Sequence, residues 1–226
     1  MKRLLLTLMV MGCTYALIAQ TEPPKEESPF ASAEAQSVTD VIIPYLSIAS
    51  GTVVLDAVID ETGKVQKVEV RRDIVSITEP AVNAVKEWQF SPATFEGKAI
   101  ASRVPVAVNV RPRLYYVDQV PLPALIPQTD AAIQAEFQSA DVIRAVFPYH
   151  PVNNDSDAVT VVLEVALNSA GKVEKVKVLS DVPPATAEAV AVVGDWRFMP
   201  ATLNGHAVPS KIILVFVFRA PFSSYP

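Results

Sequence analysis

The side chains that could do chemistry are few, and their spacing does not form a familiar site. Asp60 and Glu61 are adjacent carboxylates that could act as an acid–base pair or bind calcium. They precede Gly63 in a short polar segment, and a second copy of this segment has Asn168 and Ser169 in their place. We therefore interpret the pair as part of a solvated hairpin turn.

The remaining candidate groups also lack partners in the sequence. His150 and His206 have no counterparts in the other copy, and the single cysteine, Cys13, excludes a disulfide framework. Ser180 and Asp181 have no histidine at a spacing that suggests a catalytic triad. We expect no catalytic residue, no metal site and no bound cofactor, and we expect that the chain is not an enzyme.

Composition indicates a folded protein that does not bind nucleic acid. The 226 residues are 50% hydrophobic and 19% charged, with a net charge of −5, 19 prolines and 7 glycines. High apolar content and low net charge argue against general disorder. No run of lysine or arginine is present that could follow a phosphate backbone.

The N-terminus has the pattern of a secretory signal peptide. Lys2 and Arg3 precede 16 mostly apolar residues, Leu4 to Ala19, and the polar residues Thr21 to Glu27 follow. We predict a signal peptide over residues 1–19 and export across the inner membrane. Two alternatives stay open: Cys13 could be lipidated, because the preceding residues resemble a lipobox, or the segment could remain as an inner-membrane anchor.

A duplication is the strongest feature of the sequence. Residues 52–110 match residues 160–218 at 23 of 59 positions, without a gap and at an offset of 108. Trp88-Gln89-Phe90-Ser91-Pro92-Ala93-Thr94, for example, returns as Trp196-Arg197-Phe198-Met199-Pro200-Ala201-Thr202.

The segments in front of the two copies also resemble each other. Ala33 to Ser37 parallels Ala135 to Ser139, and Pro44-Tyr45 parallels Pro148-Tyr149. This alignment gives the second copy four extra residues before its first strand. The predicted division is a signal peptide (1–19), a disordered lead-in (20–32), domain 1 (33–112), a proline-rich linker (113–128) and domain 2 (129–226).

Each copy has the hydrophobic pattern of a small α+β unit. Residues 52–60 alternate between apolar and polar, with Asp56 on the polar face, which predicts a half-buried strand and a hairpin through Gly63. A helix capped by Thr78, with Pro80 in its first turn, follows and ends near Trp88.

The spacing of the apolar residues on this helix predicts that Trp88, and Trp196 in the second copy, pack in the core. A final strand at 103–110, or 211–218 in the second copy, completes each unit. The predicted fold is therefore two tandem ββαβ units, each a three-stranded antiparallel sheet with one helix on one face.

These motifs resemble the C-terminal domain of TonB-family proteins. The resemblance rests on the hairpin glycine, an alanine-bearing helix and the W-x-F-x-P-A block on a ββαβ frame. In the first copy these motifs are Pro44-Tyr45, Gly51-Thr52-Val53, Asp60-Glu61-Thr62-Gly63, Ala81, Trp88 to Ala93 and Gly97; in the second they are Pro148-Tyr149, Val161, Gly171, Ala189, Trp196 to Ala201 and Asn204-Gly205.

The resemblance implies a protein of the periplasm that binds other proteins. TonB C-terminal domains hold a short peptide of an outer-membrane receptor as an added strand, with energy from an inner-membrane motor (ExbB and ExbD). The partner would be such a receptor peptide or another envelope protein, in TonB-dependent outer-membrane transport. The short N-terminal apolar run, the short segment 20–40 and the tandem arrangement depart from a motor-coupled protein.

The final strand of the second copy is the predicted peptide-binding strand. By the resemblance, the strand after the helix lies at the edge of the sheet. In the first copy this strand contains Pro105, which cannot donate a ladder hydrogen bond. The second copy has Ile213 there, and we predict that Lys211, Ile213, Val215 and Val217 bind the peptide.

The alternative function is that of an envelope scaffold. In that case the two domains pack on each other, and their strand edges serve assembly instead of transient peptide binding.

We predict that the mature protein begins near Gln20, because polarity changes abruptly after Ala19. N-terminal sequencing of protein from the envelope should therefore start at this residue. An intact Met1, or a lipid-modified Cys13, would contradict the prediction.

Overall fold

The two copies share one central sheet. A computed structural model describes residues 29–111, 122–126, 137–148 and 158–219. Six strands form the sheet in the order β12-β11-β16-β8-β3-β4, and four smaller sheets of two or three strands surround it. The predicted signal peptide, Cys13 and His150 lie outside the described residues.

The described chain is mostly β, with two short α-helices. The helices are α1 (Val75–Lys86), α3 (Ala185–Val192) and a 3₁₀ turn, η1 (Val193–Asp195). The strands are β1 (Phe30–Ala31), β2 (Glu34–Ser37), β3 (Gly51–Ile59), β4 (Val65–Arg72), β5 (Gln89–Ser91), β6 (Ala93–Phe95), β7 (Lys98–Ile100), β8 (Ser102–Val110), β9 (Phe137–Gln138), β10 (Asp141–Arg144), β11 (Val159–Leu167), β12 (Val173–Ser180), β13 (Arg197–Met199), β14 (Ala201–Leu203), β15 (His206–Val208) and β16 (Ser210–Phe218).

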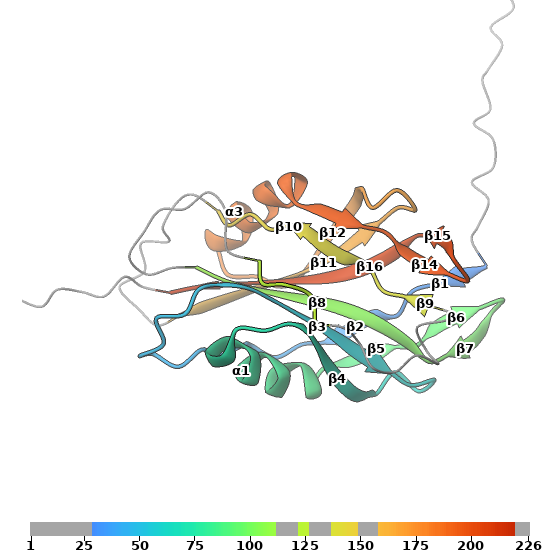
Figure 1. The fold of residues 1–226 in the computed structure, drawn as a ribbon, viewed down its shortest axis with the longest axis horizontal. Helices are drawn as coiled ribbons and strands as arrows, with labels where there is room; N and C mark the ends of the chain where they lie inside the picture. Colours follow the sequence, from blue (N-terminus) through green and yellow to red (C-terminus); the bar gives the residue numbers. More distant parts are fainter. Residues whose placement is uncertain (1–28, 112–121, 127–136, 149–157, 220–226) are drawn as a thin grey trace, which may run out of the picture.

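The two halves of the central sheet are joined through the last strand of each copy. Within each half the strands are antiparallel, but β16 pairs with β8 in parallel, from Ile213 opposite Val106 to Val217 opposite Val110. The strand order is mirrored about the parallel pair of β16 and β8, so the two copies are related by a pseudo-twofold axis that runs along these strands. Such an axis exchanges the two faces of the sheet, so α1 lies below it and α3 above it (Figure 1).

The α+β class is therefore confirmed, but the description as ββαβ units is incomplete. It omitted β5, β6 and β7 and their equivalents β13, β14 and β15, which form the smaller sheets with the leaders. Among the described residues, no helix is long and apolar enough to cross a membrane.

The hairpin glycines are required by a close backbone approach as well as by their φ angles. Gly63 has φ +88° and Gly171 has φ +73°. A Cβ on Gly63 would lie 1.8 Å from the carbonyl oxygen of Phe90, and one on Gly171 would lie 2.5 Å from that of Phe198. The backbone of the hairpin turn therefore packs directly against the strand after the tryptophan, and only glycine leaves room for this contact.

The helices begin differently from the prediction. Thr78 is not an N-cap, because the residue before α1 is Ile74, and the equivalent Thr186 is not one either, because Pro184 precedes α3. Each threonine lies inside its helix and accepts a hydrogen bond from an earlier backbone N–H, at 3.0 Å from Ile74 and 2.8 Å from Val182. Pro80 lies in the second turn of α1, beyond the first turn in which it was predicted.

The segments before the copies, which we call the leaders (residues 30–43 and 137–147), align at a different offset from the prediction. Ala35 pairs with Phe90, and Val142 pairs with Phe198, so the offset of equivalent leader residues is 107. The predicted offset of 102 is wrong. The strand β1 also lies within the predicted disordered lead-in, where Phe30 is buried.

The core is not divided at the linker. One cluster contains the helix-facing residues of the first copy together with Val162, Ile213, Val215 and Val217 of the second. The other cluster contains the helix-facing residues of the second copy together with Val54 and Ala107 of the first. These mixed cores argue against independent folding of the two copies.

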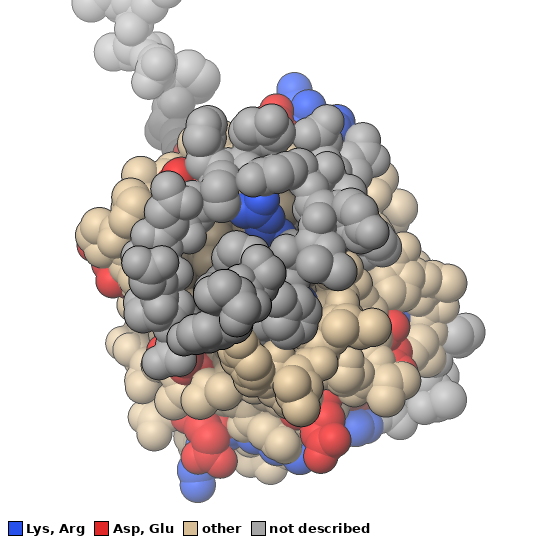
Figure 2. Space-filling view, turned by 90° about the vertical axis from the view of Figure 1, so that its left-hand side faces the viewer, with Lys and Arg blue, Asp and Glu red and all other residues tan. Residues whose placement is uncertain are grey.

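The strands predicted to be half-buried are buried on both faces. In β3 every residue but Val58 is buried, including Asp56 on the predicted polar face. The cause is that the leaders cross over. The leader of the second copy covers the face of the first copy opposite α1, and the leader of the first copy covers the face of the second copy opposite α3. Viewed from one end, much of the described surface is uncharged, and acidic and basic side chains lie side by side along the edge on the side of α1 (Figure 2).

We predict that Ile213→Pro unfolds the protein instead of only removing a binding strand. A proline in an interior strand removes a ladder hydrogen bond and introduces a clash, at a cost of about 3 kcal/mol or more. Urea unfolding followed by circular dichroism measures this loss. Ile213→Val is the matched control and should cost about 1 kcal/mol; an Ile213→Pro protein of nearly native stability would contradict the interior position of β16.

Candidate functional site

The predicted peptide-binding strand lies inside the sheet. One side of β16 pairs with β11 over nine residues, from Val159 opposite Phe218 to Leu167 opposite Ser210. The other side pairs with β8. Both edges of the strand are therefore occupied in this structure, and the expectation that it lies at the edge of the sheet is wrong.

The four predicted binding residues have two different roles. Ile213, Val215 and Val217 have no exposed surface and pack into the core on the α1 side. Lys211 is partly buried and forms ion pairs with Glu164, at 3.3 Å, and with Glu34. Peptide binding by these residues stays a prediction, and it would require β8 to leave β16.

Pro105 marks the end of the parallel pairing. It directly precedes Val106, the first residue of β8 that pairs with β16. Its missing N–H therefore does not interrupt the ladder between the copies. The sequence difference between Pro105 and Ile213 fixes where the two strands separate, which is a different role from the predicted blocking of an exposed edge.

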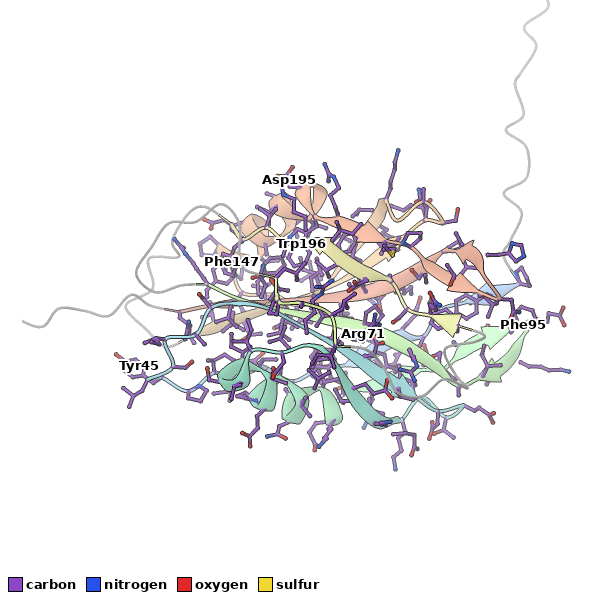
Figure 3. The ribbon with its side chains drawn as sticks, in the orientation of Figure 1. Tyr45, Arg71, Phe95, Phe147, Asp195 and Trp196 are labelled. Atoms are coloured by element: carbon purple, nitrogen blue, oxygen red, sulfur yellow. The ribbon has the colours of Figure 1, made fainter. Side chains whose placement is uncertain are left out.

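The face of the first copy opposite α1 carries a buried ion cluster. The Asp56 carboxylate has no exposed surface and lies 2.9 Å from the Arg71 guanidinium, which is near the middle of the molecule (Figure 3). The Ser139 hydroxyl donates a hydrogen bond to the same carboxylate at 2.9 Å, and Arg103 lies 3.9 Å away. Asp56 thus connects its own strand to the leader of the second copy.

Glu69 completes this cluster on β4. It forms ion pairs with Arg103 and with Lys67. Burial acts to raise the pKa of the Glu69 carboxyl, but the hydrogen bonds from Arg103 and Lys67 outweigh it, and the pKa is lowered below 4.5. The carboxylate is therefore charged at neutral pH and compensates the buried guanidinium.

The second copy has an equivalent cluster on the opposite face. Glu164 occupies the position of Asp56, and Lys211 occupies that of Arg103. A carboxylate oxygen of Glu164 accepts a hydrogen bond from the Ala35 backbone N–H at 2.9 Å. The hydrogen bond from Lys211 lowers the pKa of Glu34 below 4.5, although burial opposes it. This cluster holds the leader of the first copy.

The leader of the second copy is fixed by a further ion pair. Arg72 pairs with Asp141 at 2.8 Å and also donates to the carbonyl oxygens of Val142 and Pro123. The backbone N–H of Ile126 donates to the Arg71 carbonyl at 2.7 Å. Residues 122–126 of the predicted linker therefore lie along the outer edge of β4.

The tryptophans anchor the leaders from the core side. Trp88 and Trp196 are both nearly fully buried, as predicted. The indole N–H of Trp88 donates to the Thr39 carbonyl at 3.1 Å, and that of Trp196 donates to the Val146 carbonyl at 2.8 Å. The indole of each copy therefore holds its own leader, while the charged clusters attach the leader to the other copy.

The other candidate residues take part in local structure. The hydrogen bond from the Thr62 hydroxyl lowers the pKa of the Asp60 carboxyl, and the backbone N–H groups of Lys64 and Thr62, which also donate to it, lower it further. Asn168 accepts equivalent bonds in the second copy. The Ser180 hydroxyl donates to the Thr160 carbonyl. Among the described residues, no three His, Cys, Asp or Glu side chains gather as metal ligands would.

The family is settled by a comparison with family models. The model of the C-terminal domain of the Gram-negative bacterial TonB protein matches residues 48–111 and 145–220, together more than half of the chain. The chain belongs to the TonB C-terminal family. It carries the family domain as a tandem pair, and membership supports an envelope- or transport-associated role. No individual curated protein matches the chain.

Most of both leaders lies outside the matched segments. The first match begins at residue 48 and the second at residue 145, so β1, β2, β9 and β10 precede them. Sequence reasoning missed the function of these segments. Their shared pattern, Phe30-Ala31-Ser32-Ala33-Glu34 and Phe137-Gln138-Ser139-Ala140-Asp141, was the signal that could have revealed it.

We predict that Asp56→Asn destabilises the whole protein by about 3–5 kcal/mol, because it leaves the buried Arg71 guanidinium without its charged partner. Urea unfolding measures the change. Asp60→Asn is the matched control, since Asn168 serves the same turn in the second copy, and it should change stability by no more than about 0.5 kcal/mol. Equal effects of the two variants would contradict the importance of the cluster.

Stability should decrease in acid. The carboxyls of Glu34 and Glu69 have native pKa values lowered below 4.5, so their contribution is complete above the unfolded value. This stabilising contribution is lost progressively as the pH falls below about 4.5 and then through the lowered native pKa values of the two carboxyls. Urea midpoints between pH 7 and pH 3 should fall less steeply for a Glu34→Gln/Glu69→Gln protein than for the natural one; parallel profiles would contradict the assignment.

Proposed function

We propose that this TonB-family protein is a non-enzymatic binding and assembly module of the periplasm. The observation that carries the proposal is the reciprocal pairing of β8 and β16. Each copy uses the strand that the family resemblance assigns to peptide capture to hold the other copy. The outer surfaces of the shared sheet and its helices are then left for partner proteins.

A second candidate is peptide capture by strand addition, possibly in TonB-dependent outer-membrane transport. Family membership favours it. It requires the copies to separate along β8 and β16, which would break the parallel ladder and expose Ile213, Val215 and Val217. The two candidates therefore differ in whether the central pairing must open.

A disulfide between β8 and β16 tests the two candidates directly. Val106 and Ile213 are direct partners in the parallel register, and Cys13 is the only cysteine in the sequence. In a Val106→Cys/Ile213→Cys protein on a Cys13→Ser background, a disulfide would lock the pairing. Reduced and oxidised forms of the same protein are matched controls.

Two measurements decide the outcome. A photo-cross-linking residue at Val178, an exposed position on β12, reports partner proteins in the envelope. Titration with a receptor-derived peptide reports strand addition. Adducts that persist in the locked protein support the assembly module, whereas peptide binding that is present in the reduced form and lost in the locked form would overturn it in favour of strand addition.

A further inference from the structure

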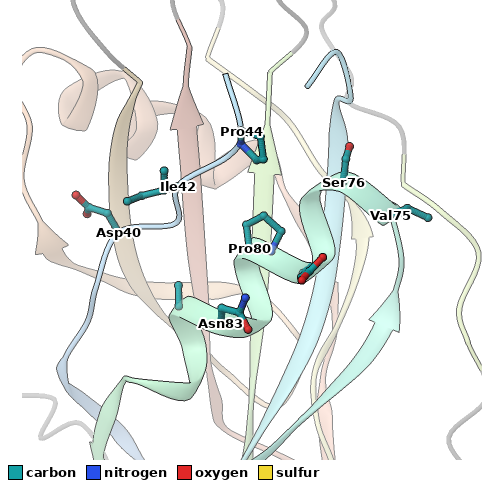
Figure 4. A pocket seen from close by; sticks show the side chains of 9 residues that line it. Asp40, Ile42, Pro44, Val75, Ser76, Pro80 and Asn83 are labelled. Carbon is teal, nitrogen blue, oxygen red and sulfur yellow. The ribbon is translucent and has the colours of Figure 1, made fainter. Parts of the chain in front are cut away.

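A groove runs between α1 and the leader of the first copy. It has a volume of about 680 Å³ and is open to the surface (Figure 4). Ile42 forms part of the leader wall, while Val75, Glu79 and Pro80 form part of the helix wall. The β8–β16 pairing takes no part in it, so the groove is accessible without separation of the copies.

The two walls are tied together at both ends. The Thr39 hydroxyl donates to the Ala84 carbonyl at 3.3 Å, and the Ser47 and Ser76 hydroxyls are hydrogen-bonded at 3.1 Å. Beyond the second tie, Arg219 donates to the Ser47 carbonyl at 2.7 Å. The groove is therefore preformed, and binding of a ligand would not include the free-energy cost of ordering its walls.

Aliphatic side chains around the groove are exposed to solvent. Ile42 is 80% exposed and Val75 is 83% exposed, and both are among the residues that line the groove. Val75 is the first residue of α1, and its side chain points away from the leader (Figure 4). Leu46 and Ile48, which follow in the same segment, are also largely exposed. Exposed aliphatic side chains that gather beside a groove are typical of a surface that binds another protein.

The polar groups of the groove are mainly hydrogen-bond acceptors. The carboxylates of Asp40 and Glu79 line it and have no partner among the described residues, and no lysine or arginine lines it. Pro80 has no N–H, so the carbonyl of Ser76 lacks its helical donor.

The duplication provides an internal comparison. At the positions of Glu79 and Asn83, the second copy has Ala187 and Ala191. The polar groups at these two positions are therefore absent from the second copy, although the segment from Thr186 to Trp196 keeps the threonine, alanine, valine and tryptophan of the shared fold. The fold does not require these polar groups, which favours a function that is specific to the first copy.

We propose that this groove binds a short segment of a partner protein that carries lysine or arginine beside aliphatic side chains. The cationic groups pair with Asp40 and Glu79, and the aliphatic groups cover Ile42 and Val75. The proposal rests on the proposed binding function and adds a site and a ligand chemistry to it.

The probe is a fluorescein-labelled octapeptide of alternating leucine and lysine, titrated into residues 20–226 and followed by anisotropy. Peptides of alternating leucine and glutamate, and of alternating serine and lysine, are matched controls. Saturable binding of the first peptide, about tenfold or more tighter than that of both controls, is the expected result. Absence of saturable binding overturns the proposal.

Variants locate the binding. Asp40→Lys/Glu79→Lys should weaken binding about tenfold, and Ile42→Ser/Val75→Ser should weaken it by a similar factor. Glu174→Lys and Met199→Ser change exposed residues of the second copy and should leave both binding and the unfolding midpoint unchanged. Glu79→Ala/Asn83→Ala introduces the residues of the second copy and provides a milder test.

Binding that is unaffected by the Asp40→Lys/Glu79→Lys change would overturn the site. Photo-cross-links at Val178 distinguish this failure from a failure of the proposed function. If those adducts persist while the peptide does not bind in the groove, the protein is still a binding module, but this groove is not its docking site.

Discussion

The parallel pairing of β8 with β16 is the constraint on which the rest of the structure depends. It places the helices on opposite faces of one sheet and leaves half of each face without a helix. Those halves carry Asp56 and Val54 in the first copy and Glu164 and Val162 in the second, and water must be excluded from their apolar members. The crossed leaders meet this requirement, so the pairing explains why the leaders exist.

The charged clusters then specify how the leaders lie. Burial of Asp56 and Glu164 costs free energy that the nearby cations offset only in the correct geometry. A leader shifted by one residue would remove Ser139 from Asp56 or the Ala35 N–H from Glu164. The rings of Phe30 and Phe137, which are equivalent leader residues, meet at a centroid distance of 5.5 Å, so both leaders are also in contact with each other.

Much of each copy could be predicted from the sequence because it follows local rules. The alternation in residues 52–60, the tight turns at Glu96-Gly97 and Asn204-Gly205, where all four residues have positive φ, and the buried tryptophans depend on neighbours in the same copy. The joined sheet depends on contacts between copies. An intact strand such as Lys211 to Phe218, apolar on both faces, is typical both of an exposed docking strand and of an interior strand. The resemblance predicts an exposed strand, whereas the second apolar face indicates an interior strand, which is what the structure shows.

The same reasoning limits where partners can bind. A strand that is apolar on both faces is stable only when both faces and both edges are covered, and in this chain the second copy supplies that cover for the first. The outer strands β4 and β12 instead carry Lys67, Glu69, Lys175 and Lys177, and charged edge strands disfavour addition of another strand. The proposed binding would therefore depend on side chains more than on free backbone groups. That requirement favours grooves between elements, where a few acceptors and aliphatic groups can be held at fixed positions.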